Sequence, residues 1–144
     1  MGNLNTPNAS PLHGIRILDL SRLLPGPYCT MLLADLGAEV IKIETPGLGD
    51  YMRIIPPFVR DPRTGDDVSA AYLMVNRNKK SVALNFRNQR GKQVFLRLVS
   101  DADVIIETFR PGAAEKWGIG YEAMRALNSK IVFCSLSGYG LPGP

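Results

Sequence analysis

The sequence is poor in the residue types that build metal sites and disulfide frameworks. Of its 144 residues, two are cysteine and one is histidine. Cys29 and Cys134 lie inside apolar runs and match no metal-ligand spacing, so we expect buried free thiols in a reducing compartment. His13 precedes the first predicted strand and has no second imidazole as partner. We therefore predict neither a zinc site nor a metal cofactor.

Long apolar runs and a secretory leader are also missing. No stretch approaches the roughly 20 apolar residues that a transmembrane helix needs. The opening MGNLNTPNAS has neither the basic nor the apolar region of a signal peptide. We predict a cytoplasmic protein with no membrane partner, in which residues 1–11 form a disordered lead.

The glycine motifs of nucleotide-binding proteins are absent. The first predicted strand is followed by SRLLPGP and not by G-x-G-x-x-G, and no G-x-x-x-x-G-K-[ST] loop occurs. This argues against a nicotinamide enzyme and against a nucleoside triphosphatase. The net charge of +4 is not gathered in one stripe, and no nucleic-acid motif is present, so we predict no nucleic-acid partner. A polyanionic small molecule accounts for the local basic clusters equally well.

Short apolar runs alternate with stretches of helical periodicity. The predicted strands cover 15–21, 39–44, 81–86, 103–107 and 130–137, and the predicted helices cover 27–36, 70–76, 89–100, 113–117 and 121–127. We therefore predict an α/β fold, a Rossmann-like parallel sheet with flanking helices. Residues 45–68, rich in Gly, Pro and Asp, are predicted to form a long loop. Because the loop GYGLPGP follows a strand expected inside the sheet, we predict a sheet that is incomplete at its C-terminal end, as in a fragment.

The predicted topology brings the carboxyl ends of all strands to one edge, where ligands bind in open α/β sheets. The segments expected at this edge are 22–27, the residues from Thr45 onward, 84–87, 108–112 and 138–144. We look for the functional site there.

Several features of this edge leave two interpretations open. Arg22 is either an exposed loop residue or a ligand contact. The run NRNKKS is either a solvated turn or a phosphate site. Arg110 can hold an anion together with the free N–H groups of the following helix, or it can pair with Glu107 or Glu115. Phe109 can face an adenine ring or fill the core.

Four segments together resemble the family III CoA-transferases and their racemase relatives. They are DLSRLLPGPYCTMLLADLGAEVIKIETPGLGDYMR, NRNKKSVALNF, DVIIETFRPGAAEKWGIGYE and IVFCSLSGYGLPGP. The resemblance runs from Leu12 to Pro144 with the motifs in the family's order and spacing. It implies that residues 12–144 are the N-terminal part of a large CoA-binding α/β domain.

The resemblance also implies which residues contact the CoA. They come from the strand edge and the basic turn: Arg22, Leu24, Pro25, Lys79, Lys80, Leu84, Arg87, Thr108, Phe109, Arg110 and Lys116. Thr45 stands where the family often has an arginine on the adenosine phosphates, so that contact is not carried over.

The function implied by the resemblance is CoA transfer between an acyl-CoA thioester and a carboxylic acid. In the transferases an aspartate attacks the thioester and forms a mixed anhydride. In the racemases a histidine and an aspartate exchange the α-proton. Both sets lie downstream of the GYG loop, so we assign no catalytic residue within this chain. An α-methylacyl-CoA racemase and a non-catalytic CoA-binding module stay as alternatives, and an interlocked homodimer is implied for the full-length protein.

Overall fold

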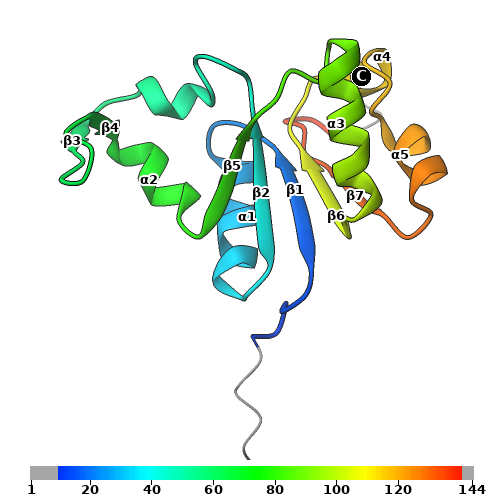
Figure 1. The fold of residues 1–144 in the computed structure, drawn as a ribbon, viewed down its shortest axis with the longest axis horizontal. Coiled ribbons are helices and arrows are strands. Elements are labelled where there is room, and N and C mark those ends of the chain that lie inside the picture. The colour runs from blue at the N-terminus through cyan, green and yellow to red at the C-terminus, as the bar shows by residue number, and fades with distance from the viewer. Residues whose placement is uncertain (1–9, 141–144) are drawn as a thin grey trace, which may run out of the picture.

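A central parallel sheet organises the chain, for which a computed structural model describes residues 10–140. Residues 1–9 of the predicted lead and residues 141–144 of the predicted final loop lie outside this range. The strands are β1 (Arg16–Leu20), β2 (Glu39–Glu44), β5 (Lys79–Ala83), β6 (Val104–Glu107) and β7 (Val132–Ser135). They lie in the order β5-β2-β1-β6-β7, and every neighbouring pair is parallel. The predicted α/β fold with a parallel sheet and flanking helices is confirmed (Figure 1).

Helices cover both faces of this sheet. Helix α1 (Pro25–Asp35) packs on one face, where Ala34 meets Ile17 and Ile106 of the strands. On the other face lie α3 (Gln89–Ser100), α4 (Ala113–Lys116) and α5 (Tyr121–Leu127), whose apolar residues share a core with Leu18 and Ile105. Successive strand residues therefore point into different cores, which explains why the strands read as continuous apolar runs.

The region after β2 is more structured than the sequence predicted. Residues 45–68 were expected to be a loop, but they contain the 3-10 helix η1 (Tyr51–Ile54) and most of an antiparallel hairpin formed by β3 (Phe58–Arg60) and β4 (Asp67–Ser69). Helix α2 (Ala70–Asn76) follows, and its Tyr72 and Val75 pack on Met52 of η1. The prediction missed these elements because they are short and depend on this packing. In Figure 1 the hairpin and α2 extend beyond β5, to one side of the sheet.

Strand β5 begins two residues earlier than predicted. It starts at Lys79, where the sequence suggested residue 81, and it pairs with β2 through Lys79 opposite Val40. The predicted basic turn is therefore wrong for Lys79 and Lys80, which are strand residues at the amino end of β5. None of the described helices has the length and hydrophobicity to cross a membrane.

Candidate functional site

A groove opens where β1, β6 and β7 end. We call it the carboxyl-edge groove; it has a volume of about 800 Å³, and its lining includes Arg22, Leu23, Thr108, Phe109, Arg110 and Gly138. Strand β1 continues into α1 on one face of the sheet, whereas α4, which follows β6, lies on the other. Neighbouring loops that diverge in this way leave a crevice, the usual ligand position in open α/β sheets.

Arg22 joins the two sides of this crevice. Its backbone N–H donates to Thr108 Oγ1 at 3.0 Å, which ties the loop after β1 to the loop after β6. Its guanidinium Nη2 donates to Thr45 Oγ1 at 2.9 Å, and the same group lies 5.8 Å from the centre of the Tyr51 ring. Arg22 is half-buried, so part of this cation stays open to a ligand.

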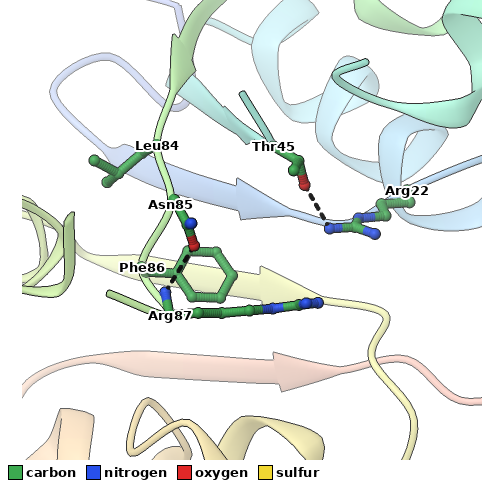
Figure 2. Close-up of a pocket in the computed structure, with 6 residues that line it drawn as sticks. All are labelled: Arg22, Thr45, Leu84, Asn85, Phe86 and Arg87. Atoms are coloured by element: carbon green, nitrogen blue, oxygen red, sulfur yellow. Dashed lines mark hydrogen bonds between the residues drawn. The ribbon is translucent and has the colours of Figure 1, made fainter. Parts of the chain in front are cut away.

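A smaller pocket of about 100 Å³ adjoins Arg22 on the other side (Figure 2). Thr45, at the end of β2, lines it together with residues 84–87, which follow β5. The guanidinium of Arg87 lies 4.5 Å from the centre of the Trp117 ring, a distance typical of a cation–π contact. The structure thus brings together Arg22, Leu84 and Arg87, which were predicted as site residues from separate segments.

Arg110 is exposed on the rim of the carboxyl-edge groove and forms no ion pair with any residue between 10 and 140. The predicted alternative partner Glu107 is buried and bonded elsewhere, because it accepts from the Phe109 N–H and the Ser135 hydroxyl. The predicted anion site at the start of the next helix is not supported. Helix α4 has only four residues, and the N–H of Ala113 already bonds to the carbonyl of Arg110.

Phe109 packs against the core. Its ring lies edge-on to Trp117 with a centroid distance of 5.0 Å, and 6.1 Å from the ring of Phe86. It also lines the carboxyl-edge groove. The structure therefore shows the core-filling role, and adenine stacking stays a prediction.

The remaining predicted site residues are scattered. Leu24 lies with Tyr28 and Met74 around a separate apolar hollow, and Lys116 is exposed on α4 and lines neither the groove nor the pocket.

Lys80 pairs with Glu39 at the amino ends of the strands, opposite to the groove. Lys79 is buried, and its Nζ is bonded to Asp19, Asn76 and the Pro27 carbonyl. The Lys79 ammonium is thus occupied by protein acceptors, and phosphate binding by Lys80 stays a prediction.

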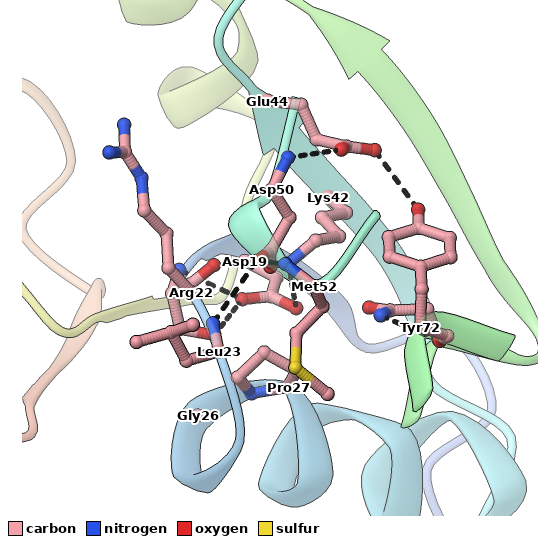
Figure 3. Close-up of polar contacts among 12 residues, drawn as sticks. Asp19, Arg22, Leu23, Gly26, Pro27, Lys42, Glu44, Asp50, Met52 and Tyr72 are labelled. Atoms are coloured by element: carbon pink, nitrogen blue, oxygen red, sulfur yellow. Dashed lines mark hydrogen bonds and ion pairs between the residues drawn. The ribbon is translucent and has the colours of Figure 1, made fainter. Parts of the chain in front are cut away.

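The sequence prediction also missed a chain of buried charges next to the loop of Arg22 and Leu23; Figure 3 labels Asp19, Lys42 and Asp50 of this chain. The side chains of Lys79, Asp19, Lys42 and Asp50 are each 2% exposed or less. Asp19 Oδ2 lies 3.1 Å from Lys79 Nζ and 4.0 Å from Lys42 Nζ, and Lys42 Nζ lies 2.9 Å from Asp50 Oδ2. Burial alone would raise the pKa of Asp19, but the two ammonium groups and hydrogen bonds from Ser21 and Thr30 outweigh it and hold the pKa below its usual value. The signal in the sequence was a charged residue inside each of the apolar runs ILDL and VIKIE.

Glu44 forms a second buried cluster next to this chain. Its carboxylate accepts from Arg53 Nε and Nη2, both at 2.7 Å, from the Ser81 hydroxyl at 2.7 Å and from the Asp50 N–H at 2.9 Å. Burial would raise the pKa of Glu44, but these donors outweigh it and lower the pKa to about 2. Glu44 therefore stays ionised, with its charge matched by Arg53, next to the segment that carries Asp50.

Neither the cysteines nor the acidic residues form a metal centre in the described part of the chain. Within residues 10–140, no group of three or more His, Cys, Asp or Glu side chains is placed to hold an ion. Cys29 and Cys134 are free, as predicted, but half-buried rather than fully buried, and burial raises the pKa of the Cys29 thiol.

Comparison with known proteins gives one consistent family. The family model described as CoA-transferase family III matches residues 12–144. Human succinyl-CoA:glutarate CoA-transferase is 46% identical over 138 residues, which are 95% of this chain and 30% of that protein. Succinyl-CoA:mesaconate CoA-transferase of Haloarcula marismortui is 46% identical over 133 residues, 91% of this chain and 33% of that protein. The crystal structure of a CAIB/BAIF family protein from Brucella suis superposes with a TM-score of 0.88 at 40% identity, over 94% of this chain and 35% of that one. The chain thus spans about a third of the length of the relatives it matches.

Proposed function

Because this chain belongs to CoA-transferase family III, we propose that the full-length protein transfers CoA from an acyl-CoA thioester to a carboxylic acid. The relatives support a narrower choice. Those from human and Haloarcula are named for succinyl-CoA as donor and for the dicarboxylates glutarate and mesaconate as acceptors. We propose succinyl-CoA as donor and a dicarboxylate as acceptor, and residues 12–144 as the N-terminal part of the CoA-binding domain.

The observation that carries this proposal is a set of arginines without acidic partners at the carboxyl edge. Arg22 and Arg110 line the groove, and Arg22 and Arg87 line the adjoining pocket. Within residues 10–140, none of the three forms an ion pair. CoA carries a pyrophosphate and a ribose phosphate, and guanidinium groups bind phosphate through paired hydrogen bonds.

The proposed CoA surface consists of the predicted residues that lie around these arginines. It comprises Arg22, Pro25, Leu84, Arg87, Thr108, Phe109 and Arg110. Contacts from Leu24 and Lys116 stay predictions. Lys79 is left out, because a phosphate could reach its Nζ only by displacing Asp19 and the Pro27 carbonyl.

We propose that the chemistry uses an aspartate outside this chain. Its carboxylate would attack the thioester carbonyl and release the CoA thiolate, leaving an acyl-aspartyl mixed anhydride. The residues of this chain would hold the CoA so that its thioester meets that carboxylate, which is a matter of positioning. The homodimer and the cytoplasmic location also stay predictions.

A direct assay of the purified full-length protein tests the proposal. Incubation with succinyl-CoA and glutarate should give glutaryl-CoA and succinate, resolved by liquid chromatography and mass spectrometry, and calorimetry should detect binding of CoA but not of NAD. A racemase would instead exchange the α-hydrogen of a 2-methylacyl-CoA for deuterium in heavy water without an acceptor. Acceptor-independent exchange with no acyl transfer would overturn the proposed reaction.

A further inference from the structure

Asp50 links two walls of the carboxyl-edge groove through one carboxylate oxygen. Its Oδ1 accepts from the Leu23 N–H at 3.2 Å and from the Met52 N–H at 3.0 Å. Leu23 belongs to the loop between β1 and α1, and Met52 belongs to η1. Arg22 and Tyr51, which both line the groove, are the immediate neighbours of these two residues.

Leu23 needs such a support. Its φ of 61° is in the left-handed region, which residues with a side chain rarely adopt unless the surrounding structure holds them there. The bond to Asp50 holds the N–H of Leu23, and the bond from Arg22 N–H to Thr108 Oγ1 holds the preceding peptide. The direction of the Arg22 side chain therefore depends on this pair of hydrogen bonds.

Lys42 in turn holds Asp50 and the same loop. Its Nζ lies 2.9 Å from Asp50 Oδ2 and donates to the Ser21 carbonyl at 3.0 Å. The side chains of Lys42 and Asp50 are each 1% exposed, so neither touches a ligand in the groove directly. A buried charge pair is a costly way to gain stability, since apolar residues of similar size often serve as well. Figure 3 shows this pair beside the loop of Arg22 and Leu23.

We propose that Asp50 is a positioning residue for the CoA site: it sets the conformation of Leu23, and thereby the direction of Arg22, while Lys42 neutralises the buried charge of Asp50. The inference rests on the proposed function, because the ligand that Arg22 would meet is CoA. Asp50 acts through two backbone N–H groups, and it neither contacts the CoA nor takes part in the chemistry.

Two double variants of the full-length protein separate this role from a contribution to folding. Lys42→Met/Asp50→Asn removes both charges but keeps an amide oxygen that can accept from Leu23 and Met52. Lys42→Met/Asp50→Leu removes the charges and the acceptor at similar volume. Calorimetry with CoA, steady-state kinetics with succinyl-CoA and glutarate, and a melting curve are measured on each. Glu39→Gln serves as the control, because it breaks the ion pairs of Glu39 with Arg16 and Lys80 at the opposite end of β2.

The Asn variant should bind CoA within about threefold of the wild type, and the Leu variant about tenfold or more weakly, since the N–H groups of Leu23 and Met52 then lack their acceptor. The KM for succinyl-CoA should rise with this loss, while the KM for glutarate stays unchanged. Glu39→Gln should leave CoA affinity unchanged, because its ion pairs are exposed and lie far from the groove. Equal CoA affinity of the two double variants at a temperature where both are folded would overturn the proposal.

Two further outcomes are also decisive. If the Leu variant does not fold, amide hydrogen exchange of the wild type takes its place: Leu23 should be as protected as Met52, and exchange of Leu23 at the free rate overturns the proposal. A wild-type protein that binds no CoA overturns the proposed function and this inference together. If the wild type binds CoA and the two double variants bind it with equal affinity, this inference alone is overturned.

Discussion

The arginines of this chain divide into two groups by their partners. One group is held by carboxylates and comprises Arg16, Arg53, Arg60, Arg63 and Arg77. The other group has no acidic partner among the described residues and comprises Arg22, Arg87, Arg90, Arg97, Arg110 and Arg125; of these, Arg22, Arg87 and Arg110 line the groove or the pocket. Arginines that neither support an element nor neutralise a buried acid are the ones that a phosphate-bearing ligand can use.

Arg110→Ala should weaken CoA binding with little loss of stability. A hydrogen bond to a charged group contributes about 1.5–3 kcal/mol, which corresponds to a loss of affinity of about ten- to a hundredfold. Arg110 is exposed and holds no carboxylate, so the free energy of unfolding should change by less than about 0.5 kcal/mol. Calorimetry with CoA and a melting curve on the same full-length variant measure both quantities.

The matched control is Arg97→Ala on α3. Arg97 is also exposed, but it lies in the last turn of α3, toward the amino ends of the strands. Its loss should leave CoA affinity unchanged. Reduced stability of Arg110→Ala at unchanged affinity would remove Arg110 from the proposed site and give it a structural role.

Glu44 should make stability depend on pH in the acid range. The pKa of its carboxyl is lowered from 4.5 to about 2 in the folded protein, so the unfolded chain binds this proton more readily. The stabilisation, about 2–3 kcal/mol, is fully present above pH 4.5 and is lost as the pH falls toward 2. Glu44→Gln removes it at every pH.

Urea unfolding of the wild type and of Glu44→Gln at pH 7 and pH 3 checks the sign. The stability difference between the two proteins should be large at pH 7 and much smaller at pH 3. Glu122→Gln, on the exposed side of α5, should show no such dependence. A difference that is the same at both pH values would show that Glu44 is not the titrating group.

At the scale of the element, the lack of a side chain at Gly26 lets helix α1 pack closely against the loops that form the groove. A Cβ on Gly26 would lie 2.2 Å from Ser21 Cβ and 2.9 Å from Thr108 Cγ2. The first turn of α1 therefore packs directly on the two loops that Arg22 and Thr108 join. Large apolar residues of α1, such as Tyr28 and Leu32, point away from this contact and are exposed.

Gly26→Ala should lower both stability and CoA affinity. Alanine favours a helix, by about 1 kcal/mol relative to glycine, but the clash with Ser21 Cβ requires backbone movement, and overpacking of this kind costs about 1–3 kcal/mol. The displaced loops carry Arg22 and Thr108, so CoA binding should weaken as well. Thermal melting and calorimetry on the variant test both effects.

Gly138→Ala is the control for this substitution. Its added Cβ would meet no atom within 4 Å, so stability should be unchanged. Wild-type stability of Gly26→Ala would mean that the contact between α1 and the loop after β1 relaxes at no cost, and that the helix does not set the position of the groove.

At the scale of the whole molecule, the sheet order decides what the chain can do by itself. The loops after β1 and β6 lie side by side because these strands are neighbours in the sheet. In the sequence the strands are far apart, because 83 residues lie between Leu20, the last residue of β1, and Val104, the first residue of β6. The groove that they form offers cations and backbone groups, but Glu107 and Asp50, whose carboxylates are bonded to its loops, are both buried. A binding surface is thus present without an obvious nucleophile.

The 144-residue chain alone should therefore not transfer CoA. The purified chain and the full-length protein are assayed in parallel with succinyl-CoA and glutarate, and glutaryl-CoA should appear with the full-length protein only. Turnover by the 144-residue chain that is abolished by Asp35→Asn or Asp50→Asn would show that the catalytic carboxylate lies within it.

Much of the fold could be predicted because strand and helix periodicities are local. The bounds of the five strands of the parallel sheet and of helices α1 to α5 were predicted to within a few residues, and the carboxyl edge was identified from the strand direction; the order of the strands in the sheet was not predicted. Residues 45–68 were mispredicted because η1 and the β3–β4 hairpin are short and depend on contacts with α2. The start of β5 was misplaced because NRNKKS is polar, and only pairing with β2 makes Lys79 a strand residue.

The sequence by itself determined the family, the alternation of strands and helices, and the segments that meet at the groove, since these follow from local pattern and motif order. Only the tertiary structure decided which charged side chains are buried and which line the groove and the pocket. Lys79 and Arg87 both come from a basic segment around β5, yet Lys79 is directed inward to Asp19 while Arg87 lies over Trp117 at the pocket. The physical reason is that a buried charge needs a partner, and Asp19, which lies near both Lys79 and Lys42, belongs to β1, distant in sequence from either lysine.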